Sequence, residues 1–239
     1  MRALIMAGGA GKRLHPLTQD LPKPLLRVRG KPILEHLLLC LRHACVDDVT
    51  LAVAHLASKL EAHFSSGANH GLRISYLHED FPLGTAGALG ILERFEETIL
   101  MTNADILTDL DFGKMLAQHR NQGAVLTVAS QLRHTQISLG VLEVDANGMV
   151  SGYLEKPRLE HRVGIGIYAV DPEVKAFIPP GRPFDMPDVI NALVAAGKKV
   201  GCYDHRGNWI DIGTPEEYSR AEEHSWLGAN LDSVTGASA

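Results

Sequence analysis

The sequence has few cysteines and few aromatic residues. Of its 239 residues, three are cysteine (Cys40, Cys45 and Cys202) and 5% are Phe, Trp or Tyr. An odd number of cysteines at these separations fits neither a zinc motif nor a redox motif. We therefore expect the three thiols to be free, and to pack as small buried apolar side chains in a reducing compartment.

The sequence also lacks an excess of basic residues and a long hydrophobic run. The formal net charge is -5 at pH 7, and no run of Lys and Arg is interleaved with aromatics, which argues against a nucleic-acid-binding protein. The longest apolar stretch, residues 33–41, contains Glu35 and His36 and cannot span a bilayer. The apolar start, residues 1–7, is too short for a signal peptide. We expect a cytoplasmic protein that binds neither nucleic acid nor membrane.

Strand-like and helix-like segments alternate along the first half of the chain. The predicted strands are residues 2–6, 49–54, 72–77, 98–102 and 124–130, and the predicted helices are residues 33–44, 58–64, 85–95 and 112–122. This alternation is typical of an α/β fold in which helices cover both faces of a mostly parallel sheet. Ligands bind such sheets at the carboxyl ends of the strands.

The second half is richer in β-structure. Asp145-Ala146-Asn147-Gly148 lies between two strand-like segments and predicts a hairpin over residues 140–155, because Asn-Gly accommodates positive φ. Further elements are predicted as strands at 164–170 and 200–203 and helices at 188–196 and 214–224, the last capped by Thr214. We expect one domain over residues 1–227 and a disordered tail over residues 228–239.

A glycine-rich loop, Gly8-Gly9-Ala10-Gly11-Lys12-Arg13-Leu14, follows the first predicted strand. Its glycines let backbone N–H groups approach a ligand, and Arg13 offers a forked cation suited to phosphate. It is not a Walker P-loop, because Arg13 stands where Ser or Thr should be, nor a dinucleotide fingerprint, because Leu14 takes the place of the third glycine. Taken alone, the loop leaves open a tight turn that binds nothing.

Three charged residues stand next to predicted strand or loop ends. Pro22 and Pro24 stiffen the backbone around Lys23, which suits an ammonium group held against phosphate. Asp105 directly follows a predicted buried strand, and Asp211 lies between two isoleucines just before a helix. Carboxylates at such positions suit Mg²⁺, which prefers carboxylate, water and substrate phosphate. An exposed lysine and turn-forming aspartates remain the ordinary alternatives.

Other polar residues are weaker candidates. Glu155-Lys156, at the end of a predicted strand, could accept hydrogen bonds from sugar hydroxyls and pair with a phosphate, although it is also a common surface dipeptide. Asp109 and Asp111 are interpreted as an ordinary loop residue and a helix cap. None of the 12 histidines has metal-ligand spacing or a convincing nucleophile partner.

Taken together, these motifs resemble those of the sugar-1-phosphate nucleotidyltransferases, also called nucleotide-sugar pyrophosphorylases. The resemblance runs from residue 1 to about residue 224. Any one motif is weak evidence for the family, whereas all six motifs in this order are specific to it. The motifs are residues 8–18, Pro22-Lys23-Pro24, Pro82-Leu83-Gly84-Thr85-Ala86-Gly87-Ala88, Asn103-Ala104-Asp105, Glu155-Lys156-Pro157 and Trp209-Ile210-Asp211-Ile212-Gly213-Thr214-Pro215.

The resemblance implies a Rossmann-like α/β fold with a smaller sugar-binding β subregion. It implies that Mg²⁺ is held by Asp105 and Asp211, which with Arg13 and Lys23 form the catalytic set. The nucleotide-binding residues it implies are Ala7, Gly8, Gly9, Gly11, Lys12, Arg13, Glu79, Gly84 and Thr85. The residues it implies for the sugar phosphate are Asn103, Gly140, Glu155, Lys156 and Gly164.

Two departures from the family pattern bear on the substrates. Lys12 stands where the family usually has a small hydroxyl residue, and Gly164 stands where an Asn usually touches the sugar. Residues 82–87 look most like guanylyltransferases acting on mannose 1-phosphate or heptose 1-phosphate, so we expect GTP and a sugar 1-phosphate as partners. UTP or dTTP as the nucleotide, and a non-catalytic nucleotide-sugar-binding or regulatory homologue, remain alternatives. A homodimer is a possible assembly.

Overall fold

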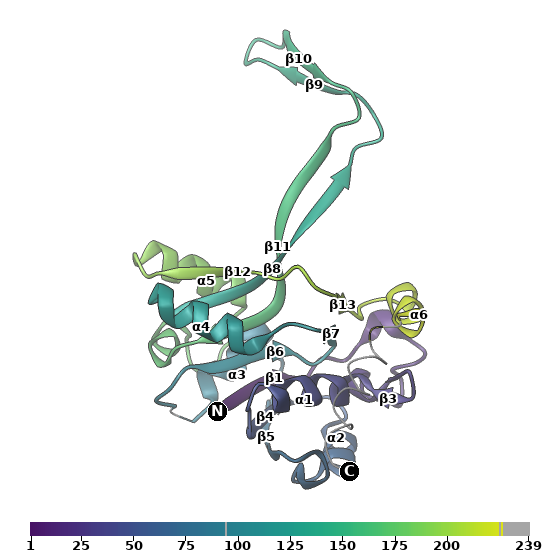
Figure 1. Cartoon of the computed structure of the whole chain (residues 1–239), viewed down its shortest axis with the longest axis vertical. Helices are drawn as coiled ribbons and strands as arrows, with labels where there is room; N and C mark the ends of the chain where they lie inside the picture. The colour runs from purple at the N-terminus through teal and green to yellow at the C-terminus, as the bar shows by residue number, and fades with distance from the viewer. Residues whose placement is uncertain (94, 225, 227–239) are drawn as a thin grey trace, which may run out of the picture.

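A seven-stranded sheet forms the centre of the protein, in the order β12-β8-β11-β6-β1-β4-β5 (Figure 1). The computed structural model describes residues 1–93, 95–224 and 226. The strands of the sheet are β1 (Arg2–Met6), β4 (Asp48–Val53), β5 (Arg73–His78), β6 (Ile99–Asn103), β8 (Leu126–Gln136), β11 (Arg158–Val170) and β12 (Val200–Asp204). All neighbours pair in parallel except β11, which is antiparallel to both β6 and β8. The predicted mostly parallel α/β sheet is confirmed.

Helices cover both faces of this sheet. On one face lie α1 (Ile33–His43), α2 (Ala57–Phe64) and α4 (Phe112–Gln122), and on the other lie α3 (Gly84–Ile91) and α5 (Met186–Ala195). Successive residues of a strand point to opposite faces. Accordingly Ala3 and Ile5 of β1 belong to the first core, whereas Leu4 belongs to the second. A central strand buried on both sides explains why residues 2–6 are continuously apolar.

A third, smaller core joins the loops after β1 to the last described helix, α6 (Pro215–Glu223). Leu14, Val28, Leu107 and Ile212 are buried in it. Ile212 directly follows Asp211 in the sequence, so this core anchors the segment that carries that carboxylate. The predicted cap is confirmed, since the Thr214 hydroxyl oxygen accepts the N–H of Glu217 at 3.3 Å.

A long β-hairpin, here called the arm (residues 131–163), projects from the body (Figure 1). Its base is the paired β8 and β11, and its tip is a separate two-stranded sheet of β9 (Val141–Val144) and β10 (Val150–Leu154). The predicted hairpin turn is confirmed: Gly148 has φ +81° and the Asp145 carboxylate accepts the N–H of Asn147 at 2.8 Å.

Several predicted boundaries are wrong for physical reasons. The strands predicted at 124–130 and 164–170 are parts of the longer β8 and β11, whose polar, exposed ends along the arm lack an apolar pattern. The helix predicted at 85–95 ends at Ile91, because Leu92 and Phe95 are buried in the second core as loop residues. The predicted tail, residues 228–239, lies outside the described residues.

The cysteines and the helices test two further expectations. All three cysteines are free, as predicted, but the predicted burial is wrong for Cys45 and Cys202, which are exposed. Burial raises the pKa of the Cys40 thiol to about 11. Within residues 1–93, 95–224 and 226, no helix is both long and apolar enough to cross a bilayer.

Candidate functional site

The carboxyl ends of β1 and β6 lie side by side, because these strands pair in parallel with Met6 opposite Asn103. The glycine-rich loop follows β1 and leads into the short helix η1 (Lys12–Leu14). Gly11, just before η1, has φ +61°, and a Cβ there would lie 3.1 Å from Cγ2 of Thr18. Backbone conformation and space therefore both favour glycine at this position.

A hollow of about 280 Å³ opens beside this loop. Its lining combines the loop with residues far away in the sequence. The lining residues are Gly9, Gly11, Lys12, Arg13, Leu14, Lys23, Asp105 and Gly213. Six of these lining residues were predicted for the nucleotide or the catalytic set, and they thus face one space. A Cβ on Gly213 would lie 3.2 Å from a guanidinium nitrogen of Arg13, which places Arg13 directly against the segment that follows Asp211.

Lys23 lies between two carboxylates at the floor of this hollow. It begins the short helix η2 (Lys23–Leu25), and its side chain is only 10% exposed. Its Nζ makes an ion pair with Oδ2 of Asp105 and lies 4.0 Å from Oδ1 of Asp211. Oδ1 of Asp105 and Oδ1 of Asp211 are buried without a hydrogen-bond partner among the described residues. The site therefore holds two carboxylates with coordinating capacity to spare.

A two-stranded sheet brings the two aspartates together. β13 (Trp209–Asp211) pairs antiparallel with β7 (Ile106–Thr108), so that Asp211 is opposite Ile106, next to Asp105. The backbone N–H of Ile212 donates to the carbonyl of Asp105 at 3.0 Å. The sequence placed each aspartate at a strand end or on a strand, but two strands of three residues carry too short a pattern to predict their pairing.

Burial, together with a neighbouring carboxylate, perturbs the pKa of Asp211. Burial raises its pKa to about 6, and the neighbouring Asp105 carboxylate contributes to the rise. In the unfolded chain an aspartate ionises near its ordinary pKa of about 3.9. As pH rises from about 4 to 6, the unfolded state therefore loses its proton first, and folding stability falls over that window and stays lower above it.

Asp211→Asn is accordingly expected to raise the melting temperature at pH 7 in metal-free buffer. Because the Asp211 side chain is 41% exposed, the gain is discounted to about 1 kcal/mol, or about 2–4 °C in Tm. Thermal melting of both proteins at pH 4 and pH 7 checks this. A gain of equal size at both pH values would show that ionisation of Asp211 is not its cause.

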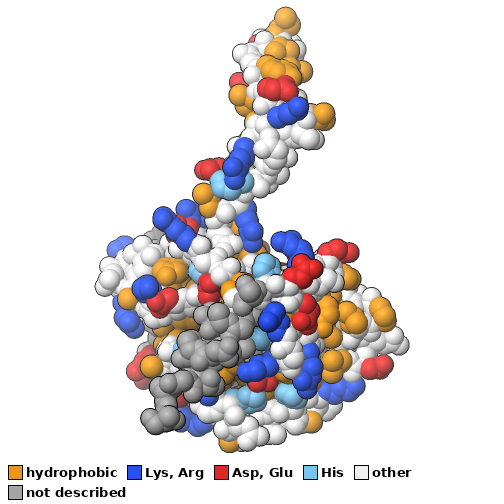
Figure 2. All heavy atoms as spheres, turned by 45° about the vertical axis from the view of Figure 1, so that its right-hand side comes forward, with side chains coloured by type: hydrophobic (Ala, Val, Ile, Leu, Met, Phe, Trp, Pro, Cys, Tyr) orange, Lys and Arg blue, Asp and Glu red, His pale blue; other side chains and the backbone are white. Residues whose placement is uncertain are grey.

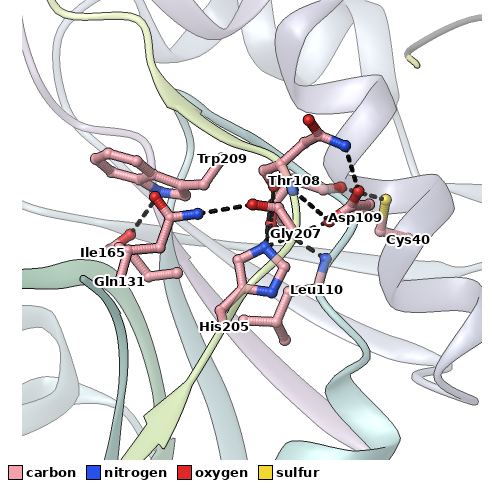
Figure 3. Close-up of polar contacts among 10 residues, drawn as sticks. Cys40, Thr108, Asp109, Leu110, Gln131, Ile165, His205, Gly207 and Trp209 are labelled. Atoms are coloured by element: carbon pink, nitrogen blue, oxygen red, sulfur yellow. Dashed lines mark hydrogen bonds and ion pairs between the residues drawn. The ribbon is translucent and has the colours of Figure 1, made fainter. Parts of the chain in front are cut away.

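A polar network that is buried at Thr108 and His205 and exposed at Asn208 fixes the far end of the β7–β13 pair (Figure 3). The Asp109 carboxylate accepts the backbone N–H of Asn208 at 2.8 Å and its side-chain amide at 2.6 Å. Nε2 of His205 lies 3.3 Å from the same carboxylate and 3.4 Å from the Thr108 hydroxyl. Gln131 donates to the carbonyl of Gly207 at 2.8 Å. We call Asp109, His205 and Asn208 the clamp.

The clamp is the part of the site that the sequence analysis missed. Asp109 is not an ordinary loop residue, because it holds the chain that runs into β13 and thereby the register that sets Asp211 beside Asp105. Only the spacing of Asp105 and Asp109 along one segment hinted at a shared role. By contrast Asp111 is the helix cap that was predicted, accepting the N–H of Lys114 at 2.9 Å.

Asp109→Ala is expected to destabilise the protein by about 1 kcal/mol, because it removes the carboxylate that accepts both hydrogen bonds from the exposed Asn208. It should also reduce the activity proposed below, since β13 loses its fixed register. Asp111→Ala is the matched control: loss of a helix cap costs about 1 kcal/mol but leaves the site intact. Urea denaturation and turnover measured on both variants check this. Equal activity in the two variants would contradict a role for the clamp in the site.

The residues predicted for the base and ribose lie around the loop in two groups. A Cβ on Gly8 would lie 3.5 Å from Oε2 of Glu79, so these two are neighbours. Burial raises the pKa of Glu79. Thr85 differs, because its N–H and hydroxyl both donate to Asp185, at 2.7 and 3.0 Å. Gly84, at φ +78°, turns the chain against the same Asp185. These contacts tie the start of α3 to α5, and nucleotide binding by Thr85 stays a prediction.

The residues predicted for the sugar phosphate are only partly brought to the site. Asn103 packs under Gly166, where a Cβ would lie 2.8 Å from Nδ2 of Asn103. Gly164 lies on β11 directly next to the arm, opposite Ser130 of β8.

The other three lie on the outer arm, which points away from the body (Figure 1). There the Tyr153 hydroxyl donates to Glu155 at 2.7 Å, and Lys156 lies 3.8 Å from Glu155. Gly140 faces the same Tyr153, since a Cβ on it would lie 1.9 Å from the phenol oxygen. The structure does not place Gly140, Glu155 and Lys156 beside the two aspartates, and their sugar-binding role stays a prediction.

Comparison with known proteins places this arrangement in context. A family model described as "Nucleotidyl transferase" matches residues 2–225. The chain is 32% identical to a UTP–glucose-1-phosphate uridylyltransferase of Synechocystis, over 92% of this chain and 62% of the relative. It is 33% identical to a mannose-1-phosphate guanylyltransferase of Mycobacterium tuberculosis, over 91% of this chain and 62% of the relative. The chain thus spans about three fifths of the length of these curated relatives.

Solved structures share the fold. A putative glucose-1-phosphate thymidylyltransferase from Bacillus anthracis superposes with a TM-score of 0.76, at 24% identity, over 93% of this chain and 94% of that one. HddC from Yersinia pseudotuberculosis, complexed with GMP-PN, superposes with a TM-score of 0.71, at 24% identity, over 93% and 98%. The likeness confirms the predicted Rossmann-like architecture.

Proposed function

Because the chain belongs to the nucleotidyl transferase family, we propose that it transfers a nucleotidyl group from a nucleoside triphosphate to a sugar 1-phosphate and releases pyrophosphate. One observation carries the proposal. Arg13, Lys23 and Asp105, from three separate segments, line the hollow beside the glycine-rich loop, and Asp211, from a fourth, lies 4.0 Å from Lys23. Two cations and two carboxylates suit a reaction between two anions better than they suit a binding module.

This reaction needs no general base, because a sugar phosphate is already an anionic nucleophile at neutral pH. Its oxygen attacks the α-phosphorus in line, the new P–O bond forms, and the bond to the leaving pyrophosphate breaks. The barrier is repulsion between anions together with charge that builds up on the leaving group. Positioning and charge neutralisation are what the protein must supply. Arg13 and Lys23 provide fixed positive charge, and the loop provides backbone N–H groups.

We propose that Asp105 and Asp211 hold Mg²⁺. Two observations support these residues as Mg²⁺ ligands. Each aspartate has a buried carboxylate oxygen without a hydrogen-bond partner among the described residues, and Mg²⁺ usually binds through one or two carboxylates together with substrate phosphates and water. No cluster of three or more His, Cys, Asp or Glu is placed to bind a metal within the described ranges, so the substrate phosphates would complete the shell. When bound, the ion would neutralise phosphate charge. Lys23, between the carboxylates, keeps them close together in its absence.

GTP is the nucleotide we favour. Supporting it are the likeness of residues 82–87 to guanylyltransferases and the mannose-1-phosphate guanylyltransferase among the relatives. The uridylyltransferase of similar identity supports UTP and glucose 1-phosphate as the second candidate pair. The homodimer stays a prediction.

A substrate panel tests the proposal. The protein is incubated with Mg²⁺, each of GTP, UTP, dTTP, ATP and CTP, and a set of sugar 1-phosphates, with pyrophosphate release as the readout. We expect release that needs both substrates and is fastest with GTP. Release with no combination would overturn the enzyme assignment in favour of a nucleotide-sugar-binding homologue.

A further inference from the structure

A second hollow, of about 510 Å³, is lined in part by Asp211 and by no residue of the glycine-rich loop. It has three walls: β13 contributes Trp209 and Asp211, α6 contributes Glu217 and Arg220, and the base of the arm contributes Arg133. Its volume is in the range of ligand pockets. Figure 2 shows Lys and Arg side chains at the base of the arm, and basic and acidic side chains intermixed on the face beneath it. None of the site predictions from the sequence used Arg133 or Arg220.

Arg133 is held in place by an aromatic ring. Its guanidinium carbon lies 5.3 Å from the centroid of the Trp209 ring. That ring is itself fixed, since Nε1–H of Trp209 donates to the carbonyl of Ile165 at 3.0 Å (Figure 3). An arginine stacked on an aromatic face keeps the N–H groups at its edge free for an anion. Trp209 therefore orients the guanidinium of Arg133 without accepting hydrogen bonds from its N–H groups.

Arg220 faces the same hollow from α6. It lies one helical turn after Glu217, whose Oε2 accepts the N–H of Gly213 at 2.9 Å. Residues three apart share a helix face, so this bond fixes the face that carries Arg220. Glu217 is thereby committed to the backbone rather than to the arginine.

Neither guanidinium has a hydrogen-bond acceptor or an ion-pair partner in the part of the chain that the structure describes. Two nearby arginines show the contrast. Arg162 and Arg206 both bind the Asp204 carboxylate, at 2.6 and 2.9 Å. Those pairs lie outside the second hollow, whereas the two exposed arginines that line it have no carboxylate within ion-pair distance among the described residues, although Asp211 and Glu217 line the same hollow. Unpaired guanidiniums facing one hollow favour a bidentate anion such as carboxylate or phosphate.

The spacing of Trp209 and Asp211 on β13 indicates how far Arg133 and Arg220 lie from the place where the sugar 1-phosphate would react. Trp209 and Asp211 are two residues apart on one strand, so they share a face and are about 7 Å apart along it. That span is comparable to a hexopyranose ring. A sugar whose 1-phosphate lies at Lys23 and Asp211 would therefore extend its far substituents toward Arg133 and Arg220.

We propose that the acceptor is a sugar 1-phosphate that bears a second anionic group, carboxylate or phosphate, on the side of the ring away from C1. Arg133 and Arg220 bind that group, and Trp209 orients Arg133. The inference rests on the proposed function, whose acceptor it specifies. It assigns to the chain a selectivity for acidic over neutral sugar phosphates.

Calorimetric binding in Mg²⁺ buffer tests this without requiring turnover. The ligands are glucose 1-phosphate, glucuronic acid 1-phosphate and glucose 1,6-bisphosphate, with the corresponding mannose series. We expect at least one doubly anionic ligand to bind about 10-fold or more tightly than its neutral parent, since charge-assisted hydrogen bonds are the strong ones. The uronic acid and bisphosphate arms distinguish carboxylate from phosphate.

Substitutions of the two arginines test whether they cause the tighter binding of doubly anionic ligands. Arg133→Gln and Arg220→Gln should each weaken the doubly anionic ligand about 10-fold and the neutral one less than about 2-fold. Arg133→Lys, which keeps the charge but loses the fork, should recover part of the loss. Arg206→Gln, whose partner is Asp204, is the matched control and should change neither. Thermal melting checks that each variant is folded.

Three results would overturn the inference: equal affinity for neutral and doubly anionic ligands, no measurable binding of any doubly anionic ligand, or an equal loss for both kinds of ligand in the arginine variants. Failure of the proposed function is a separate result, because it appears as absence of pyrophosphate release from the unaltered protein whatever the binding order.

Discussion

Asp105→Asn is expected to lower kcat by at least about 100-fold in Mg²⁺ while leaving the protein folded, in line with the loss of one electrostatic stabiliser from an active site. Asp105 directly follows β6, contacts Lys23 and carries an unpartnered buried oxygen. The amide keeps the shape of the side chain but removes the charge that the proposed metal and the lysine both require. Pyrophosphate release under saturating substrates measures the effect.

The matched control for this variant is Asp111→Asn. That residue lies six positions later and caps α4 outside the site. It should retain nearly full activity, because an amide also serves as a helix cap. If Asp105→Asn retained near-complete Mg²⁺-dependent activity, the assignment of this carboxylate to the reaction would be wrong.

Lys23→Met is expected to have the second large effect, on both activity and stability. The lysine side chain is 10% exposed and faces two carboxylates, so its removal leaves like charges close together without the cation that lies between them. Breaking such a pair costs about 3 kcal/mol or more, which for a chain of this size corresponds to about 6–12 °C in Tm. Activity should fall by about 100-fold, because a cation fixed against the reacting phosphates is lost.

Mg²⁺ provides a readout of this variant that does not depend on turnover. If the two aspartates hold the ion, Mg²⁺ should raise the Tm of Lys23→Met more than that of the unaltered protein, because the ion replaces the missing positive charge. Lys12→Met is the matched control: it lines the same hollow but has no ion pair with either aspartate, and its Tm should change little. Equal Mg²⁺ shifts in all three proteins would contradict the metal site.

The sequence predicted the core of the fold because local pattern and burial agree there. Strand 2–6 and helix 112–122 have the predicted bounds: the strand is apolar on both faces, and the helix begins at an Asp cap and ends at Gly123 with φ +56°. The arm was predicted only at its turn. The long base of the arm extends into solvent, where neither strand needs an apolar face. The hydrophobic pattern of the sequence therefore does not indicate how long these two strands are.

The candidate site shows the same division. Arg13, Lys23, Asp105 and Asp211 were found because each stands at a loop or strand end with an unusual neighbour, such as the prolines around Lys23. The clamp and the β7–β13 pair were not found, because they depend on contacts across about 100 residues. Arg133 and Arg220 are ordinary surface arginines until the fold places both against one hollow.

The central claim is that these residues join a nucleotide to a sugar phosphate rather than hydrolyse or merely bind either one. Mass spectrometry of the products, after incubation with Mg²⁺, a nucleoside triphosphate and a sugar 1-phosphate, tests it most directly. We expect a nucleoside diphosphate sugar and pyrophosphate in equal amounts, formed by the unaltered protein and lost in Asp105→Asn. Nucleoside monophosphate or orthophosphate with no sugar adduct, or unchanged substrates across the panel, would contradict it.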